Sequence, residues 1–137
     1  MQAGVSIAPM STNSVVSRTV VVERTARPWG WYETVSESPG QKIKRIHVLP
    51  GQQISLQKHH QRAEHWVVAQ GIARVTLDDQ EFDLVQGGHC DIALGQVHRL
   101  ANYGLVPVEI IEVQFGSYFG EEDIVRLQDD YGRTGEG

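Results

Sequence analysis

The chain has a single cysteine, Cys90, so it cannot form an internal disulfide. Nothing in its composition calls for an oxidising compartment, and we expect a cytoplasmic protein. The sequence also lacks any apolar run near the roughly 18 residues that a membrane-spanning helix needs. Its N-terminus does not show the charged and then apolar order of a secretory signal. We therefore expect no membrane partner.

Basic residues are also scarce. The formal net charge is −5, and the densest basic cluster is the stretch that contains Lys42, Lys44 and Arg45. This balance argues against nucleic acid as a partner. A length of 137 residues with 40% hydrophobic content allows one domain with its own core. We expect a flexible, small and polar tail over residues 1–17 and a single domain over 18–137.

What the sequence does contain is a series of short, β-branched or alternating segments separated by turn residues. They predict about ten strands, which is typical of a sandwich or barrel, so the expected class is all-β. A short C-terminal helix is predicted over 121–127, because its first three residues are acidic and Arg126 lies in its last turn. The predicted strands are 19–23, 32–36, 42–49, 53–58, 64–69, 72–77, 80–84, 89–93, 98–101 and 107–115.

The most informative stretch runs from Gly51 to Trp66, and a further potential ligand, His98, follows about thirty residues later. Gln57 and His59 are two residues apart, so they point to the same face of a strand. Glu64 opens the next apolar strand. Two imidazole nitrogens and two oxygen donors form a mixed set that suits a divalent cation.

The spacing of these residues resembles the two cupin motifs. Gln57 stands where most cupins have histidine, and Ala93 stands where proline is usual. The resemblance implies a single cupin jelly-roll barrel with the ligands at the barrel mouth. Metal-free cupins exist, so a site without metal is the alternative. The residues that carry the motifs are Gly51, Gln57, His59, Glu64 and Gly71, then Gly87, Ala93, Leu94, Gly95, His98 and Asn102.

Longer strings resemble the C-terminal isomerase domain of the type II phosphomannose isomerase/mannose-1-phosphate guanylyltransferase family, over about residues 26–133. The resemblance implies interconversion of mannose 6-phosphate and fructose 6-phosphate through an enediol. It also implies a divalent metal, zinc first and cobalt, manganese or magnesium as alternatives, held by Gln57, His59, Glu64 and His98. The glycine-rich segment of the guanylyltransferase domain is not found, so guanylyl transfer is not expected. The matching strings are 27–30, 44–46, 57–66, 95–100, 109–114, 116–126 and 131–133.

Two residues are candidates for the proton transfer that this reaction needs. Glu112 shares a strand face with Gln114 and is either the base or a carboxylate that orients a ligand histidine. Lys44 shares a face with Ile46 and either reaches the substrate or faces solvent.

The substrate phosphate calls for arginine, whose planar fork matches phosphate oxygens. The candidates are Arg62, Arg99 and Arg133, each of which has a surface role as its alternative. Trp66 is either a core residue or an aromatic that stacks on the sugar ring.

Two other functions compete with the isomerase. One is a non-catalytic, metal-containing cupin that binds a sugar phosphate or sugar nucleotide and partners a separate guanylyltransferase. The other is a dioxygenase, since one fold carries several chemistries, although Gln57 replaces the third histidine of the usual dioxygenase set. Because an all-β domain must protect its edge strands, such as 19–23, we also expect a homodimer.

Overall fold

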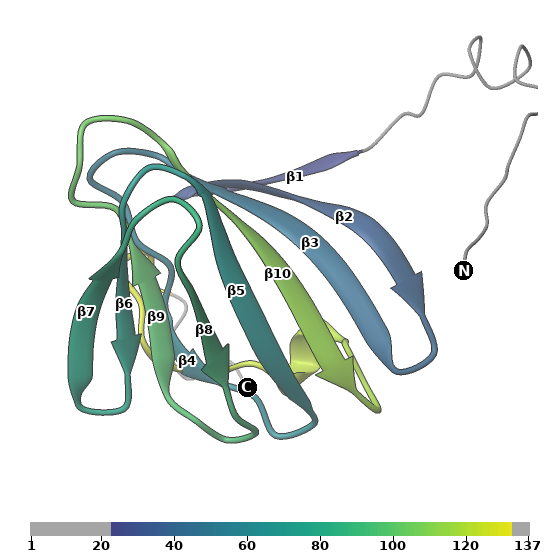
Figure 1. The fold of residues 1–137 in the computed structure, drawn as a ribbon. Coiled ribbons are helices and arrows are strands. Elements are labelled where there is room, and N and C mark those ends of the chain that lie inside the picture. Colours follow the sequence, from purple (N-terminus) through teal and green to yellow (C-terminus); the bar gives the residue numbers. More distant parts are fainter. Residues whose placement is uncertain (1–22, 133–137) are drawn as a thin grey trace, which may run out of the picture.

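The computed structural model describes residues 23–132. Their regular structure is almost entirely β-strand (Figure 1). Among the described residues, no helix has the length and apolar character needed to cross a membrane. The strands are β1 (Arg24–Arg27), β2 (Gly30–Ser38), β3 (Gln41–Val48), β4 (Leu56–Lys58), β5 (Arg62–Gln70), β6 (Ala73–Leu77), β7 (Gln80–Leu84), β8 (His89–Ile92), β9 (His98–Ala101), β10 (Val108–Gly116) and β11 (Val125–Gln128), with one 3₁₀ turn, η1 (Glu121–Asp123).

Two antiparallel sheets form the jelly roll that the resemblance to cupins implies. The larger sheet has the order β1-β2-β3-β10-β5-β8, and the smaller has the order β11-β4-β9-β6-β7. Figure 1 shows the two layers side by side, with β4, β6, β7 and β9 in one and the long strands β2, β3, β5 and β10 in the other. The core lies between their inner faces.

The inner face changes character along the strands. On β5 and β10, Val68 pairs with Ile110 at the apolar end, and both are fully buried. Two residues further along both strands, Trp66 pairs with Glu112, and beyond them Glu64 pairs with Gln114. An apolar core therefore fills one end of the barrel, while buried polar side chains occupy the other end.

The motif glycines lie at turns, as the sequence predicts. Gly51, Gly71, Gly87 and Gly95 all have positive φ values. At Gly71, where φ is +81°, an added Cβ would also lie 2.7 Å from the carbonyl oxygen of Pro107. A side chain there would be strained by both backbone conformation and packing.

The predicted helix over 121–127 is wrong. Only the 3₁₀ turn η1 forms, and β11 follows it and pairs with β4. Tertiary pairing with the short strand β4 outweighs the helix-terminus signal of three acidic residues. The predicted strand 53–58 is also shorter, because only Leu56–Lys58 is regular and Gln53 makes an isolated bridge to Ala101. The predicted tail over 1–17 lies outside the described residues, as does nearly all of the strand predicted over 19–23.

Candidate functional site

Three potential metal ligands meet at the polar end of the barrel. His59 follows β4, Glu64 lies on β5 and His98 begins β9, so the group draws on both sheets. One ligand atom from each of the three lies within 4.8 Å of the others, and all three side chains are buried. Glu64 places Oε2 3.2 Å from His59 Nε2 and Oε1 3.7 Å from His98 Nε2.

Both histidine rings are oriented by backbone carbonyls. His59 Nδ1 lies 3.1 Å from the carbonyl oxygen of Asp123, and His98 Nδ1 lies 2.9 Å from that of Gln96. These contacts hold each ring with its Nδ1 at a backbone carbonyl and its Nε2 toward Glu64. Burial also lowers the pKa of His98, which the Glu64 charge partly opposes. A neutral imidazole with a free Nε2 is the form that binds a metal.

Gln57 belongs to the same site through strand register. On β4 it stands directly opposite His98 on β9, and on its other side it pairs with Arg126 on β11. Its amide nitrogen donates to Ser55 Oγ at 2.9 Å. This hydrogen bond leaves the side-chain carbonyl oxygen available as a ligand.

The donor set therefore fits a divalent cation. It offers the Nε2 atoms of two imidazoles, one carboxylate and one amide oxygen, and the Nε2 of His59 also lies 3.2 Å from Nη2 of Arg62. Although burial raises the pKa of Glu64, its contacts with His59 and His98 hold that pKa well below the usual value. Glu64 is thus ionised, as a ligand carboxylate must be.

A second buried carboxylate lies beside Glu64. Glu112 accepts hydrogen bonds from Trp66 Nε1 at 3.0 Å and from Gln114 Nε2 at 2.6 Å. Trp66 Nε1 also lies 3.0 Å from Glu64 Oε1, so one indole bridges both acids. Burial, reinforced by the negative charge of Glu64, raises the pKa of Glu112 to about 8. The two acids therefore differ in protonation at neutral pH, with the proton on Glu112.

Arg62 lies against the ligands. Its Nε donates to Glu64 Oε2 at 3.0 Å, and Nη2 lies 3.2 Å from His59 Nε2. The Arg62 side chain is only 4% exposed. In this arrangement Arg62 supplies positive charge to a buried carboxylate that a metal would also contact.

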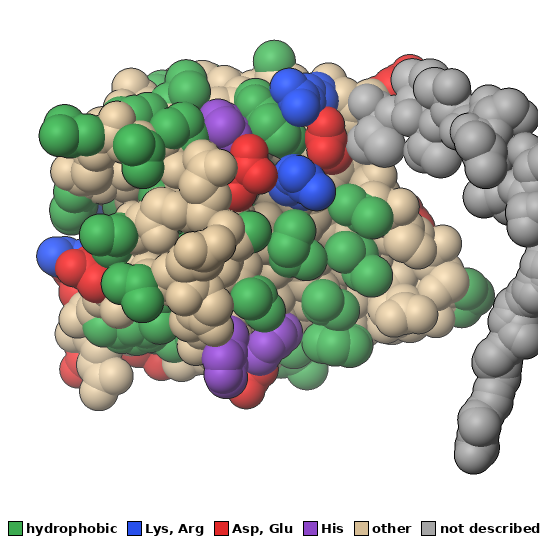
Figure 2. Space-filling view, turned by 45° about the horizontal axis from the view of Figure 1, so that its top comes forward, with side chains coloured by type: hydrophobic (Ala, Val, Ile, Leu, Met, Phe, Trp, Pro, Cys, Tyr) green, Lys and Arg blue, Asp and Glu red, His purple; other side chains and the backbone are tan. Residues whose placement is uncertain are grey.

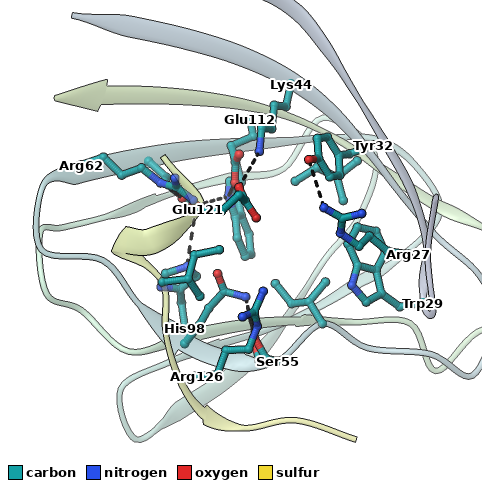
Figure 3. A pocket seen from close by; sticks show the side chains of 16 residues that line it. Arg27, Trp29, Tyr32, Lys44, Ser55, Arg62, His98, Glu112, Glu121 and Arg126 are labelled. Carbon is teal, nitrogen blue, oxygen red and sulfur yellow. Dashed lines mark hydrogen bonds and ion pairs between the residues drawn. The ribbon is translucent and has the colours of Figure 1, made fainter. Parts of the chain in front are cut away.

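A pocket opens in front of these residues, and Figure 3 shows its side chains. Lys44 lies on its wall, where Nζ is 4.2 Å from the centre of the Tyr32 ring and 3.7 Å from Glu121 Oε2. Lys44 is 6% exposed, so the structure places it inside the pocket rather than in solvent. Glu112 lies on the same wall, paired with Lys44 across β10 and β3.

The three arginines predicted to bind phosphate do not all lie at the pocket. Arg62 lines the pocket, whereas Arg99 does not. Arg99 lies on the opposite face of β9 from His98, where it donates to the carbonyl oxygens of Ile54 and Gln128. Alternation along the strand accounts for this, because His98 points inward and its neighbour must point outward. Arg133 lies outside the described residues.

Two other arginines, not singled out from the sequence, line the pocket instead. Arg27 lies beside Tyr32, with Nη2 3.4 Å from the phenol oxygen. Arg126 is brought in by β11 and lies next to Ser55 and Gln57 (Figure 3). The sequence places Arg126 in the last turn of a predicted helix. Its position in the pocket follows from the pairing of β11 with β4, which the local sequence does not indicate. Arg27 enters through the β1–β2 turn, which the sequence marks only as aromatic and turn-like.

The remaining histidines lie away from the cluster. His65 and His89 are on the outer face of the larger sheet, with their rings 5.4 Å apart and His65 bonded to Asp91. His47 stacks on Trp31, and His60 is exposed in the β4–β5 loop. Cys90 is partly buried, and burial raises the pKa of its thiol to about 11.

Comparison with known proteins gives consistent results. Residues 16–129 match the family described as Mannose-6-phosphate isomerase C-terminal. The chain is 54% identical over 110 residues to the alginate biosynthesis protein AlgA of Pseudomonas aeruginosa, covering 80% of this chain and 23% of AlgA. It is 52% identical to the xanthan biosynthesis protein XanB of Xanthomonas campestris (79% and 23%) and 45% identical to a mannose-1-phosphate guanylyltransferase of Klebsiella pneumoniae (78% and 23%). The chain thus spans about a quarter of these relatives.

Solved structures support the fold. The capsular polysaccharide assembling protein CapF from Staphylococcus aureus aligns with a TM-score of 0.72 and 18% identity, covering 83% of this chain and 34% of CapF. A Klebsiella pneumoniae protein with a double-stranded beta-helix domain aligns with a TM-score of 0.68 and 21% identity, covering 89% of this chain and all of that chain. At these identities the likeness shows the cupin fold alone.

Proposed function

Because the chain belongs to the mannose-6-phosphate isomerase C-terminal family, we propose that it is a metal-dependent aldose–ketose isomerase. It interconverts mannose 6-phosphate and fructose 6-phosphate. The observation that carries this proposal is the buried cluster of His59, Glu64 and His98, two of which, Glu64 and His98, line a pocket that also contains cationic side chains. The relatives named for alginate and xanthan biosynthesis are consistent with a role in supplying polysaccharide precursors.

The metal ligands of this proposal are Gln57, His59, Glu64 and His98. When bound, the ion supplies polarisation of the sugar carbonyl and stabilises negative charge on the enediolate oxygens. Zinc is the ion we propose, because the set mixes imidazole nitrogen with hard oxygen donors. Cobalt, manganese and magnesium are tested beside it.

Glu112 is the proposed acid–base group. Proton transfer between C1 and C2 needs an acid–base group in the pocket wall close to the ligands, and the Glu112 carboxyl lies there. The alternative role of orienting a ligand histidine has less support, because backbone carbonyls orient both His59 and His98. Lys44, beside Glu112, is the proposed donor to a substrate oxygen.

For the phosphate, we propose Arg126 with help from Arg27. Both residues line the pocket, and Figure 3 shows Arg126 beside Ser55 and Arg27 beside Tyr32. A planar fork binds two phosphate oxygens at once. Arg133 stays a prediction from the sequence, and Arg99, which lies outside the pocket, is left out of this set.

A coupled assay tests the function. The protein is stripped with a chelator and given zinc, cobalt, manganese or magnesium, and conversion of mannose 6-phosphate to fructose 6-phosphate is followed. We expect turnover only with metal, and none for His98→Ala. A folded, metal-loaded protein that binds mannose 6-phosphate without turnover would instead support the binding cupin that partners a separate guanylyltransferase. Oxygen uptake with ferrous iron tests the dioxygenase.

The outer face of the larger sheet is the proposed homodimer interface. On β10, Ile111, Val113 and Phe115 alternate with buried residues and so face outward. Outward residues of a one-sided antiparallel sheet are normally polar. Neighbouring strands add further apolar groups there, and Figure 2 shows hydrophobic side chains lying between a charged group and a pair of histidines. These groups are Ile43 and Val67.

Charges at the two sides of this face support a second copy as the occupant. Arg45 lies on the β3 side and Asp91 on the β8 side, with β10 between them. A twofold axis along β10 would bring Arg45 of one copy toward Asp91 of the other. Light scattering after gel filtration should show that the wild-type protein is a dimer and that Val113→Lys is a monomer. Leu105→Lys is the control, because it alters an exposed loop elsewhere, and it should remain a dimer. A monomeric wild-type protein would refute the interface.

A further inference from the structure

Asp123 makes three contacts with the loop that joins β4 to β5. Its carboxylate oxygens accept hydrogen bonds from the backbone N–H groups of His60, at 3.0 Å, and Gln61, at 2.8 Å. Its backbone carbonyl accepts the Nδ1–H of His59 at 3.1 Å. The residue is only 6% exposed, although it is charged and lies in a three-residue 3₁₀ turn.

These contacts form a reciprocal lock. The ring of His59 is oriented by a carbonyl, and that carbonyl is fixed because the side chain of the same residue is bonded to the next two backbone amides. The same loop joins β4, which carries Gln57, to β5, which carries Glu64 on the other sheet. Asp123 therefore contacts both the ring of one ligand and the backbone that follows it, from a position some sixty residues later in the chain.

We propose that Asp123 is the positioning residue of this metal site, a role that rests on the proposed metal binding. It holds His59 with its Nε2 toward Glu64 and keeps the β4–β5 loop in the conformation that brings the ligands together. It does not contact the metal or the substrate itself.

The neighbouring acidic residues do not share this role. Glu121 reaches Lys44 across the pocket, and Glu122 accepts a hydrogen bond from Tyr118 at 2.6 Å. The chemistry also requires aspartate, because asparagine has a single side-chain oxygen and would turn an N–H donor toward one of the two backbone amides. Glu122→Gln is therefore a matched control, with the same loss of charge one residue away.

The test compares Asp123→Asn and Glu122→Gln with the wild-type protein by titrating Co²⁺ into chelated samples. We expect Asp123→Asn to bind Co²⁺ about 10- to 100-fold more weakly, with an altered visible absorption spectrum. Glu122→Gln should match the wild type in both. In the metal-free proteins, amide hydrogen exchange at His60 and Gln61 should be protected in the wild type and faster in Asp123→Asn.

An unchanged Co²⁺ affinity and spectrum in Asp123→Asn would overturn the proposal, as would an equal loss in Glu122→Gln. If Asp123→Asn does not fold, the wild-type exchange measurement decides, because unprotected amides at His60 and Gln61 would refute the lock. A wild-type protein that binds no Co²⁺ would also overturn it. The affinity comparison does not depend on turnover, so an inactive but Co²⁺-binding wild type would defeat the proposed isomerase alone.

Discussion

Arg62 and Glu64 form a buried ion pair on one strand, two residues apart on the same face of β5, with Nε 3.0 Å from Oε2. Both side chains are almost fully buried. The pair gives the Glu64 carboxylate a positive partner in the metal-free protein, and it couples the stability of the fold to the charge of the site.

Replacing Arg62 by methionine should therefore destabilise the chelated protein by about 3 kcal/mol, because a buried carboxylate loses its cation. Adding Co²⁺ should restore much of that loss, since the ion supplies positive charge at the same carboxylate. Chemical denaturation with and without Co²⁺ measures both effects. Arg74→Met, which breaks exposed pairs to Asp83 and Glu81, serves as the control and should stay close to wild type.

Trp66→Phe removes the indole N–H that bridges Glu64 and Glu112. Two buried acceptors then lose a donor, and we expect a loss of about 1–3 kcal/mol in the free energy of unfolding. Urea denaturation of the chelated protein provides the measurement. Trp31→Phe, which alters a ring stacked on His47 at the outer face, should cost less. Equal losses would show that ring packing, rather than the hydrogen bonds, dominates.

Arg126→Gln should raise KM for mannose 6-phosphate roughly 10- to 150-fold, because a hydrogen-bonded charge on the phosphate is worth about 1.5–3 kcal/mol. The value of kcat should change much less, since Arg126 lies across the pocket from Glu112 and Lys44 (Figure 3). Arg99→Gln, outside the pocket, should leave KM unchanged. A larger effect for Arg99 than for Arg126 would contradict the assignment.

Cys90 should react slowly with thiol reagents in the folded protein. Burial and the nearby Asp91 and Glu64 charges raise its pKa from 9.0 to about 11. The thiolate is the reactive form, and two pKa units reduce its population at pH 8 about 100-fold. Alkylation followed by mass spectrometry at pH 8 should show this protection, and the rate should rise steeply with pH up to about 11. Unfolding in urea should abolish the protection of Cys90 against alkylation.

The sequence predicted the positions of most strands because their alternation and turn glycines are local signals. The same alternation placed Glu112 and Gln114 on one face, and both are buried. The segment after β10 was predicted wrongly, because η1 and β11 depend on pairing with β4, far away in the chain. For the same reason the sequence did not predict the roles of Arg126 and Asp123, whose contacts form only when distant segments of the chain come together.

Three of the four proposed ligands lie on strands of the two sheets, and His59 directly follows β4; over residues 23–132 the two sheets are not joined by a ladder of backbone hydrogen bonds. An ion bound by them would join the sheets at the open end of the barrel, where β4 contributes only three residues. By mass action, the free energy of unfolding should then rise by about 1.4 kcal/mol for each tenfold increase in free ion above its dissociation constant. Thermal unfolding recorded against ion concentration would thus rank candidate ions by affinity, without any knowledge of the substrate.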